Sequence, residues 1–272
     1  MTEKNNKYLL HKGAVYARRM ERQEAAPVPE SYQSQVFYHG TSNTKVGKKI
    51  IQDGELRPAE ASYDFIAPVP GRVYLTPSLD YVSAYVCGGV CDSNKVKTLI
   101  KRGGQYGYLF VVKGQDLSDL VPDEDILGNS LAANKPSWLR EEFERLLDEH
   151  RNEYESMHDQ ALSDAMEIAA EEEEDPDGFD PEFYSQWYSF LDNVYAGAFP
   201  EMAMAGKFLL KYLEEEELIT LMEEMSSGGN KWNAISHDGP VKFSEAWKFD
   251  KKLAPKLKKD GSNFFELAER VK

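Results

Sequence analysis

Basic residues, cysteine and long apolar runs are all scarce in this sequence of 272 residues. The 32 Lys and Arg stand against 47 Asp and Glu, and the resulting net charge of −15 argues against a broad nucleic-acid-binding face. No stretch approaches the roughly 18 to 20 apolar residues of a membrane span, and the N-terminus lacks the apolar core of a secretory signal. These absences predict a cytoplasmic protein that does not enter a membrane.

The two cysteines, Cys87 and Cys91, form a C-x3-C pair with no further metal ligands at credible spacing. We expect them to be reduced, small apolar side chains, and we expect no metal site. A content of 41% hydrophobic residues, with 13 Phe, 15 Tyr and 4 Trp, is ample for a packed core.

Charge is unevenly distributed along the chain. Most of the acid lies between Glu141 and Glu217, in a part whose apolar spacing predicts helices, so these acidic runs are expected to be solvated helix faces. The stretch from Lys242 to Lys272 instead holds nine Lys and Arg against five Asp and Glu. That excess leaves a local contact with phosphate open.

Local patterns predict an alternation of strands and short helices in the first half. Strands are expected at 34–41, 71–76 and 105–114, with a continuous apolar run at 108–112 fit for a buried strand. Helices are expected at 43–53, with Val46, Ile50 and Ile51 as its apolar stripe and Gly54 as its C-cap, and at 78–88, with Ser78 as its N-cap. Residues 115–127 are expected to form an ordered turn region.

The second half is predicted to be helical at 136–170, 182–199 and 202–225, with an acidic break that contains Gly and Pro at 171–181. It then returns to strands at 230–250, with a turn at Asp238-Gly239-Pro240. We therefore expect an α+β domain whose sheet is completed late in the chain. The expected organisation is an N-terminal arm (1–30), a first part of the domain (31–130), an acidic helical insertion (131–228), and closing strands with a C-terminal tail (229–272).

Three short motifs follow one another at informative distances: His39-Gly40-Thr41 ends the first strand, Gly71-Arg72-Val73-Tyr74-Leu75 forms the second, and Ser83-Ala84-Tyr85 lies on the following helix. Their order and spacing resemble the ADP-ribosyltransferase superfamily, in its diphtheria-toxin and poly(ADP-ribose)-polymerase branch, whose pattern is His-Tyr-Glu. The resemblance covers residues 35–90. It implies an α+β fold with a split mixed or antiparallel sheet, and NAD as co-substrate without a metal.

The resemblance also implies roles for these residues. His39 would donate to a ribose hydroxyl of NAD, Gly40 would offer its backbone to the nicotinamide carboxamide, and Thr41 would bind the same amide. Tyr74 and Tyr85 would enclose the nicotinamide ring, since aromatic rings stack and exclude water. Clamping the dinucleotide would assist cleavage through an oxocarbenium-like state.

This sequence departs from the pattern at the third motif, which in that branch is a Glu ahead of an aromatic residue on a late strand. Here the aromatic is Trp232, and Lys231 stands where the Glu would be. Substitutes are Asn233, which could hold a ribose hydroxyl, His237, which could act as a polar group or general base, and Glu201. An acid in Asp123-Glu124-Asp125, or no catalytic partner at all, are the remaining options.

The resemblance implies transfer of a single ADP-ribose to a macromolecular acceptor, protein or nucleic acid, in a toxin or a phage–host conflict effector. The acidic insertion would then shape acceptor choice or bind a protein partner. Two alternatives stay open: a catalytically weak NAD- or ADP-ribose-binding module, and an enzyme like the NAD-dependent RNA 2′-phosphotransferases, for which Arg57 and Arg72 are the nearby cations.

Overall fold

The computed structural model describes residues 26–58, 71–87, 100–101, 103–123, 127–128, 130–131, 136–173, 198–227 and 234–272. Within them the protein is α+β, with several small antiparallel sheets and about eight helices. The chain divides into two compact units, one built on 123–214 and one on 24–59, 71–122 and 215–272. None of the helices in the described part is long and apolar enough to span a membrane.

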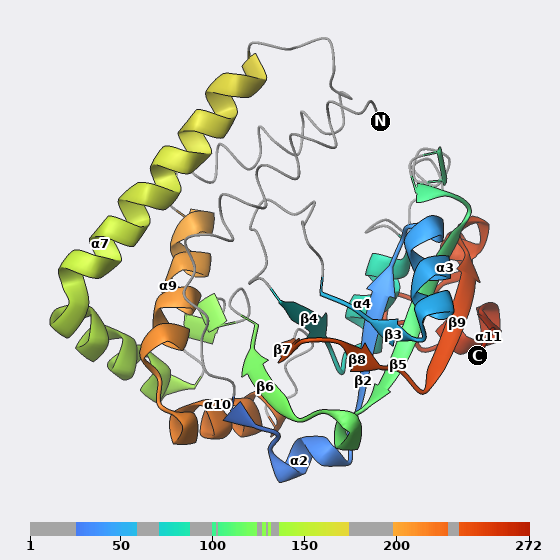
Figure 1. Ribbon diagram of the computed structural model, residues 1–272, viewed down its shortest axis with the longest axis horizontal. Coiled ribbons are helices and arrows are strands. Elements are labelled where there is room, and N and C mark those ends of the chain that lie inside the picture. Colours follow the sequence, from blue (N-terminus) through green and yellow to red (C-terminus); the bar gives the residue numbers. More distant parts are fainter. Residues whose placement is uncertain are drawn as a thin grey trace. The chain divides into compact units, whose positions relative to one another are not determined.

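In the unit built on 24–59, 71–122 and 215–272, a four-stranded antiparallel sheet holds the motif His39-Gly40-Thr41. Its order is β10-β9-β5-β2, with β2 at Val36–Thr41, β5 at Tyr106–Lys113, β9 at Glu245–Asp250 and β10 at Glu269–Arg270 (Figure 1). The expected strands at 34–41 and 105–114 are confirmed. Residues 107–112 of β5 are all buried, as the apolar run predicts, because this strand is central in the sheet.

A second four-stranded antiparallel sheet holds the Tyr74 strand. Its order is β1-β6-β7-β4, with β1 at Ala26–Pro27, β6 at Asp119–Pro122, β7 at Ile235–Asp238 and β4 at Arg72–Leu75. β3 (Glu55–Leu56) and β8 (Val241–Lys242) form a separate pair. The sheets are completed late in the chain as expected, and the positive φ of Gly239 (77°) makes the predicted turn after β7.

The expectation of only an ordered turn region at 115–127 is wrong for part of it. Residues 114–116 do form a 3-10 turn (η1, Gly114–Asp116), but β6 follows directly and pairs with both β1 and β7. Its partners lie about a hundred residues away in each direction, so the local sequence gives no sign of the pairing.

Short helices and turns complete this unit. They are α2 (Glu30–Gln33), α3 (Thr44–Asp53), α4 (Leu79–Cys87), α10 (Glu215–Ser227), the 3-10 segment η3 (Lys251–Lys256) and α11 (Phe264–Leu267). α10 contacts β1, α2 and β6, and the buried Tyr32 hydroxyl of α2 donates to the Met222 carbonyl of α10 at 2.6 Å.

Helix α3 has the caps that its sequence indicates, but it buries a different face from the one that its apolar stripe predicts. The Asn43 side chain accepts from two N–H groups of the first turn, and Gly54 closes the helix in the left-handed conformation (φ 79°), as predicted. Val46 of the expected apolar stripe is 45% exposed, however, and the buried residue is Gly47. A Cβ at Gly47 would lie 2.1 Å from Cδ2 of Tyr108, so the missing side chain is what lets α3 approach β5.

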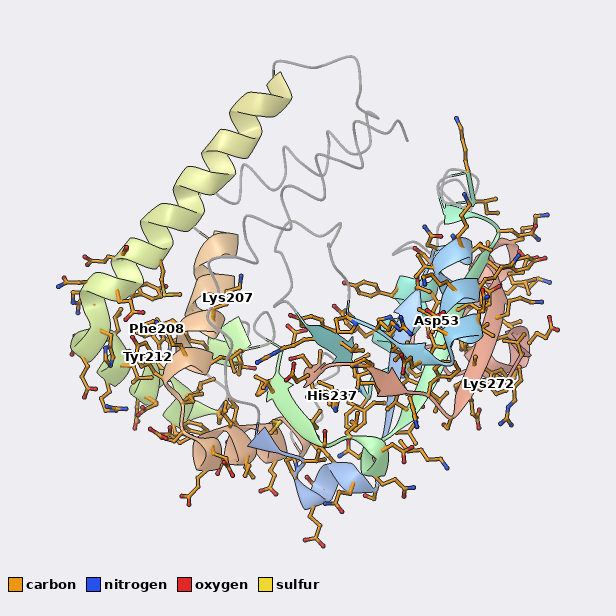
Figure 2. The ribbon with its side chains drawn as sticks, viewed as in Figure 1. Asp53, Lys207, Phe208, Tyr212, His237 and Lys272 are labelled. Carbon is orange, nitrogen blue, oxygen red and sulfur yellow. The ribbon has the colours of Figure 1, made fainter. Side chains whose placement is uncertain are left out.

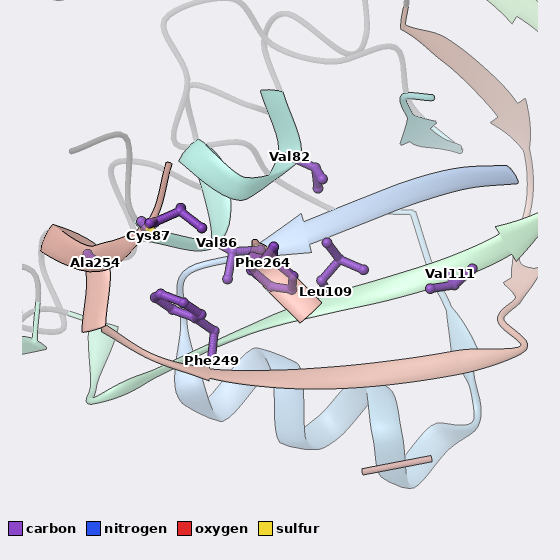
Figure 3. Close-up of a cluster of buried hydrophobic side chains, with 9 residues drawn as sticks. Val82, Val86, Cys87, Leu109, Val111, Phe249, Ala254 and Phe264 are labelled. Atoms are coloured by element: carbon purple, nitrogen blue, oxygen red, sulfur yellow. The ribbon is translucent and has the colours of Figure 1, made fainter. Parts of the chain in front are cut away.

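Helix α4 covers the first sheet through a compact apolar cluster (Figure 3). Val82, Val86 and Cys87 of α4 pack there with Leu109 and Val111 of β5 and Phe249 of β9. Ala254, Leu257 and Phe264, from the segment after β9, close the same cluster. The cluster fixes α4, and with it Tyr85, on the sheet that carries His39.

The first unit contains the helices α7 (Ser137–Glu173) and α9 (Ala198–Tyr212), which pack on each other. Aromatic rings form the contact: Phe208 of α9 meets Phe143 and Tyr154 of α7 edge to face. α7 is kinked at His150, whose backbone is non-helical and whose ring stacks on Tyr212 at 4.0 Å between centroids. Of the helix expected at 182–199, residues 182–197 lie outside the described part.

Candidate functional site

The candidate site lies where the two four-stranded sheets part. Tyr38 of β2 and Thr76, just after β4, exchange two backbone hydrogen bonds of 2.7 and 3.0 Å, and this pair forms an isolated bridge. If the antiparallel register of this pair continued along the strands, Gly40 would stand opposite Tyr74. The bridge does not extend to this pair, so β2 and β4 diverge between the first two motifs.

His39 spans this divergence. Its Nδ1 lies 3.0 Å from the carbonyl oxygen of Tyr74. A carbonyl can only accept, so Nδ1 carries the proton and, in the neutral ring, Nε2 is left as an acceptor. Burial lowers the pKa of His39, opposed by the bond to the Tyr74 carbonyl, so the ring is neutral at pH 7. A neutral His39 therefore presents an acceptor at Nε2, whereas the resemblance implies a donor.

Gly40 packs against α4 and turns its backbone polar groups toward the divergence. A Cβ there would lie 2.8 Å from Cγ2 of Val82 and 3.2 Å from both the Val82 carbonyl and Cγ2 of Val86, so the glycine first of all seats α4 on β2. Along a strand, backbone groups point alternately to the two neighbouring strands. Because the N–H and C=O of Tyr38 point to Thr76, those of Gly40 point the same way, into the divergence.

Thr41 shapes the turn that leaves β2. Its Oγ1 accepts from the backbone N–H of Asn43 at 3.2 Å, and Asn43 in turn caps α3. The hydroxyl hydrogen of Thr41 can still donate to another group. The side chain is partly buried at the C-terminal end of β2, next to Gly40.

The two tyrosines of the motifs differ in exposure. Tyr74 is partly buried on β4, and Tyr85 is 46% exposed on α4, where its ring meets that of Tyr81 edge to face at 5.2 Å between centroids. The N-cap expected for α4 is present, because Oγ of Ser78 accepts from the N–H of Tyr81 at 3.2 Å. α4 thus carries an aromatic pair of which Tyr85 is exposed and Tyr81 is partly buried.

The late strand lies directly beside the Tyr74 strand. β7 pairs with β4, with Tyr74 opposite Ser236 and Val73 opposite His237. Directly paired residues share a face of the sheet, so Ser236 lies on the face of Tyr74 and His237 on the other. His237, which is labelled in Figure 2, is buried. Its Nε2 lies 3.2 Å from Oγ of Ser118. The structure therefore does not bring His237 alongside Tyr74.

For the other candidates for the third catalytic residue, the structure describes little or nothing. Asn233, Glu124 and Asp125 lie outside the described residues, as do Lys231 and Trp232. Glu201 is in α9, where only the backbone is described, and Asp123 is partly buried just after β6.

Ser236 is the residue of this face that sequence analysis missed. It is 1% exposed, its Oγ lies 3.3 Å from Nη1 of Arg72, and it donates to the Val121 carbonyl at 3.4 Å. The signal was present in the string Ser236-His237-Asp238, since side chains alternate along a strand. Choosing between Ser236 and His237 required the register of β7 against β4.

The two arginines near the motifs both have partners in the protein. Arg72 is buried and bound to Ser236, and Arg57 is exposed and paired with Glu55 at 2.9 Å. Neither arrangement favours a site for a 2′-phosphate. Among the described residues there is no group of three or more His, Cys, Asp or Glu that could hold a metal ion, and Cys87 is buried in the apolar cluster.

No family model matches this chain, and neither the curated proteins nor the solved structures contain a detectable match to it.

Proposed function

We propose that the protein is an NAD-dependent mono-ADP-ribosyltransferase that acts on a macromolecular acceptor. The observation that carries the proposal is the bond between His39 Nδ1 and the Tyr74 carbonyl at the divergence of β2 and β4. It supports the proposal because it joins two residues that lie 35 positions apart and that both belong to the expected nicotinamide pocket.

In the proposed site the divergence would receive the nicotinamide riboside half of NAD. The backbone of Gly40 would pair with the carboxamide, and the rings of Tyr74 and Tyr85 would flank the nicotinamide. Nε2 of neutral His39 would accept from a ribose hydroxyl. These contacts hold the ribose in place and exclude water from it, as a dissociative cleavage requires.

The proposed reaction balances without a redox partner. The bond between C1′ of the ribose and the nicotinamide nitrogen breaks, and nicotinamide leaves with the electron pair. A nucleophilic lone pair of the acceptor forms the new bond to C1′, and the proton of that nucleophile passes to a base or to water. Cleavage places positive charge on the ribose, so a negative or polar group on the Tyr74 face of β4 and β7 would assist it.

Nicotinamide release from NAD, followed by chromatography with and without cell lysate, tests the proposal. We expect release by the unaltered protein and at least a hundredfold loss in His39→Ala, since the ribose contact and the His39–Tyr74 link are both removed. His150→Gln, which alters a histidine of the other compact unit, is the matched control and should retain full release. Equal release by the unaltered protein and His39→Ala, both shown folded by circular dichroism, would refute the assignment.

A second candidate is a module that binds NAD or ADP-ribose without turnover. The placement of His237 on the face of the sheet away from Tyr74 favours it, because this candidate for the third catalytic side chain does not face the proposed ribose position. Calorimetry separates the two functions. NAD binding with no nicotinamide release in any lysate fraction indicates the module, and release with labelled acceptor indicates the transferase.

A further inference from the structure

A lysine-rich segment follows β9, and we refer to residues 251–259 as the lysine segment. It contains five lysines in nine residues, of which Lys251 is buried and the other four are exposed: Lys252, Lys256, Lys258 and Lys259. Within the described part of the chain none of these four ammonium groups lies within 4.0 Å of a carboxylate. By contrast, Lys248 and Arg270 on the adjoining strands pair with Glu269 and Glu245.

The two acids that flank the segment accept hydrogen bonds from backbone and side-chain groups. Asp250 accepts from the N–H of Lys252 at 3.0 Å and from the Gln105 side chain at 2.9 Å, and Asp260 accepts from the N–H of Ser262 at 3.1 Å. Their carboxylates therefore shape the turns at each end of the segment. The pKa of Asp260 is lowered by its hydrogen bonds from Ser262 and, to a smaller extent, by the charge of Lys258. In the described part of the chain no ion pair holds the four exposed ammonium groups, so they can bind a partner.

The backbone of the lysine segment, most of which forms η3, is held firmly. Ala254 and Leu257 are buried in the apolar cluster under α4, where Figure 3 shows Ala254 beside Cys87. The Asn263 side chain accepts from the N–H of Lys258 at 2.9 Å and donates to the carbonyl of Lys256 at 3.0 Å. The lysines are thus presented from a fixed backbone, which lowers the entropy lost on binding.

The buried lysine strengthens this arrangement. Lys251 is 1% exposed, and its Nζ donates to the Gly104 carbonyl at 2.9 Å. This bond ties the start of the segment to the residues just before β5. The segment is therefore anchored at its start by Lys251, in its middle by apolar burial and at its end by Asn263.

The chemistry of this surface fits a polyanion better than a folded protein. Protein interfaces depend on buried aromatic or aliphatic anchors, whereas contact with a sugar–phosphate backbone requires chiefly cations that release counterions. The large exposed hydrophobic residues in the described part of the chain are Val36, Val46, Tyr85 and Val271, and none belongs to the lysine segment. The net charge of −15 repels polyanions elsewhere, so attraction is confined to local surfaces of this kind.

We propose that the lysine segment binds the sugar–phosphate backbone of a nucleic acid, without sequence preference. The inference rests on the segment alone and does not require NAD chemistry. Combined with the proposed transferase, it makes nucleic acid the acceptor, because α4 packs on this segment and carries Tyr85 on the same helix.

Fluorescence anisotropy with the full chain and labelled 20-nucleotide single-stranded RNA, single-stranded DNA and duplex DNA tests the proposal. Four phosphate contacts predict a slope of about −2.8 for log K against log salt on single strands, so binding weakens about fiftyfold between 50 and 200 mM salt. The three probes show whether ribose or deoxyribose, and single or paired strands, are preferred.

The matched variants are K256Q/K258Q/K259Q and K48Q/K113Q/K242Q, which remove the same charge from exposed positions inside and outside the segment. Loss of three contacts should weaken single-strand binding about a hundredfold at 0.1 M salt and reduce the slope by about 2. The control should change affinity less than threefold. Asn263→Ala keeps every charge and should weaken binding by loosening the backbone.

Three outcomes overturn the inference. They are no binding of any probe at 50 mM salt, equal losses in the two triple variants, and equal displacement of RNA by a poly-glutamate peptide of matched charge. Thermal unfolding of each variant verifies that it is folded. Because NAD is absent from this assay, its failure leaves the transferase proposal standing, and failure of nicotinamide release leaves the nucleic-acid surface standing.

Discussion

Replacement of Gly40 by alanine tests the packing of α4 against the glycine of the first motif. The new Cβ would lie 2.8 Å from Cγ2 of Val82, a stiff β-branched side chain, and 3.2 Å from the Val82 carbonyl. Overpacking of this kind costs about 1–3 kcal/mol, and we expect the upper half of that range because one neighbour is backbone. Urea unfolding followed by circular dichroism measures this loss in the free energy of unfolding.

A double-mutant cycle with Val82→Ala identifies the source of the loss. Val82→Ala alone removes two buried methyl groups and should cost about 2 kcal/mol. It also vacates the space that the new Cβ needs, so the double variant should be about 1–2 kcal/mol more stable than the sum of the single losses predicts. Additive losses, within about 0.5 kcal/mol, would refute the packing of α4 against Gly40.

Four further predictions concern three residues, His39, Gly47 and Tyr32. Because the pKa of His39 is lowered in the folded protein, its imidazole takes up a proton at a higher pH in the unfolded chain. The free energy of unfolding should therefore fall as the pH drops below about 6.5. Urea titrations of His39→Gln should lack this part of the pH dependence. Any NAD affinity should be constant from pH 8 to about 6.5 by calorimetry and weaken at lower pH, where the Nε2 acceptor of His39 is lost. Gly47→Ala should destabilise by about 2 kcal/mol or more despite the better helix propensity of alanine, because its Cβ overlaps Tyr108; a thermal shift upward would contradict this packing. Tyr32→Phe should cost about 1 kcal/mol in urea unfolding through loss of the buried bond to the Met222 carbonyl, and an unchanged midpoint would exclude that bond.

Elements with a local signal were predictable from the sequence. The strands β2, β4 and β5 are short apolar runs between turn residues, and the helices α3 and α4 have caps that are visible in the sequence. Each of these signals acts over a few residues, so no knowledge of the rest of the chain is needed.

Features that depend on distant partners were not predictable. β6 exists because β1 and β7 supply backbone groups on either side, and its own residues resemble a turn. The buried face of α3 was assigned to Val46 instead of Gly47 because hydrophobic spacing gives no weight to a glycine that admits a neighbouring ring. The lysine segment showed its charge in the sequence but not the anchors that hold it.

The candidate site was partly predictable for the same reason. The order of His39, Tyr74 and Tyr85 could be recognised, and the structure joins the first two through a hydrogen bond. The third position depends on which residues of β7 share a face with Tyr74, and that follows from a register between strands 160 residues apart. A shift of one residue would exchange Ser236 and His237.

The position of β7 between β4 and β6 has a consequence for the order of events during synthesis. A ribosome delivers β4 long before Ile235–Asp238, so Tyr74 lacks the strand that fixes it until nearly the whole described chain has emerged. Chains that end before Ile235 therefore lack the strand that pairs with Tyr74. If the protein transfers ADP-ribose, the cell that makes it meets the activity only after translation through Asp238.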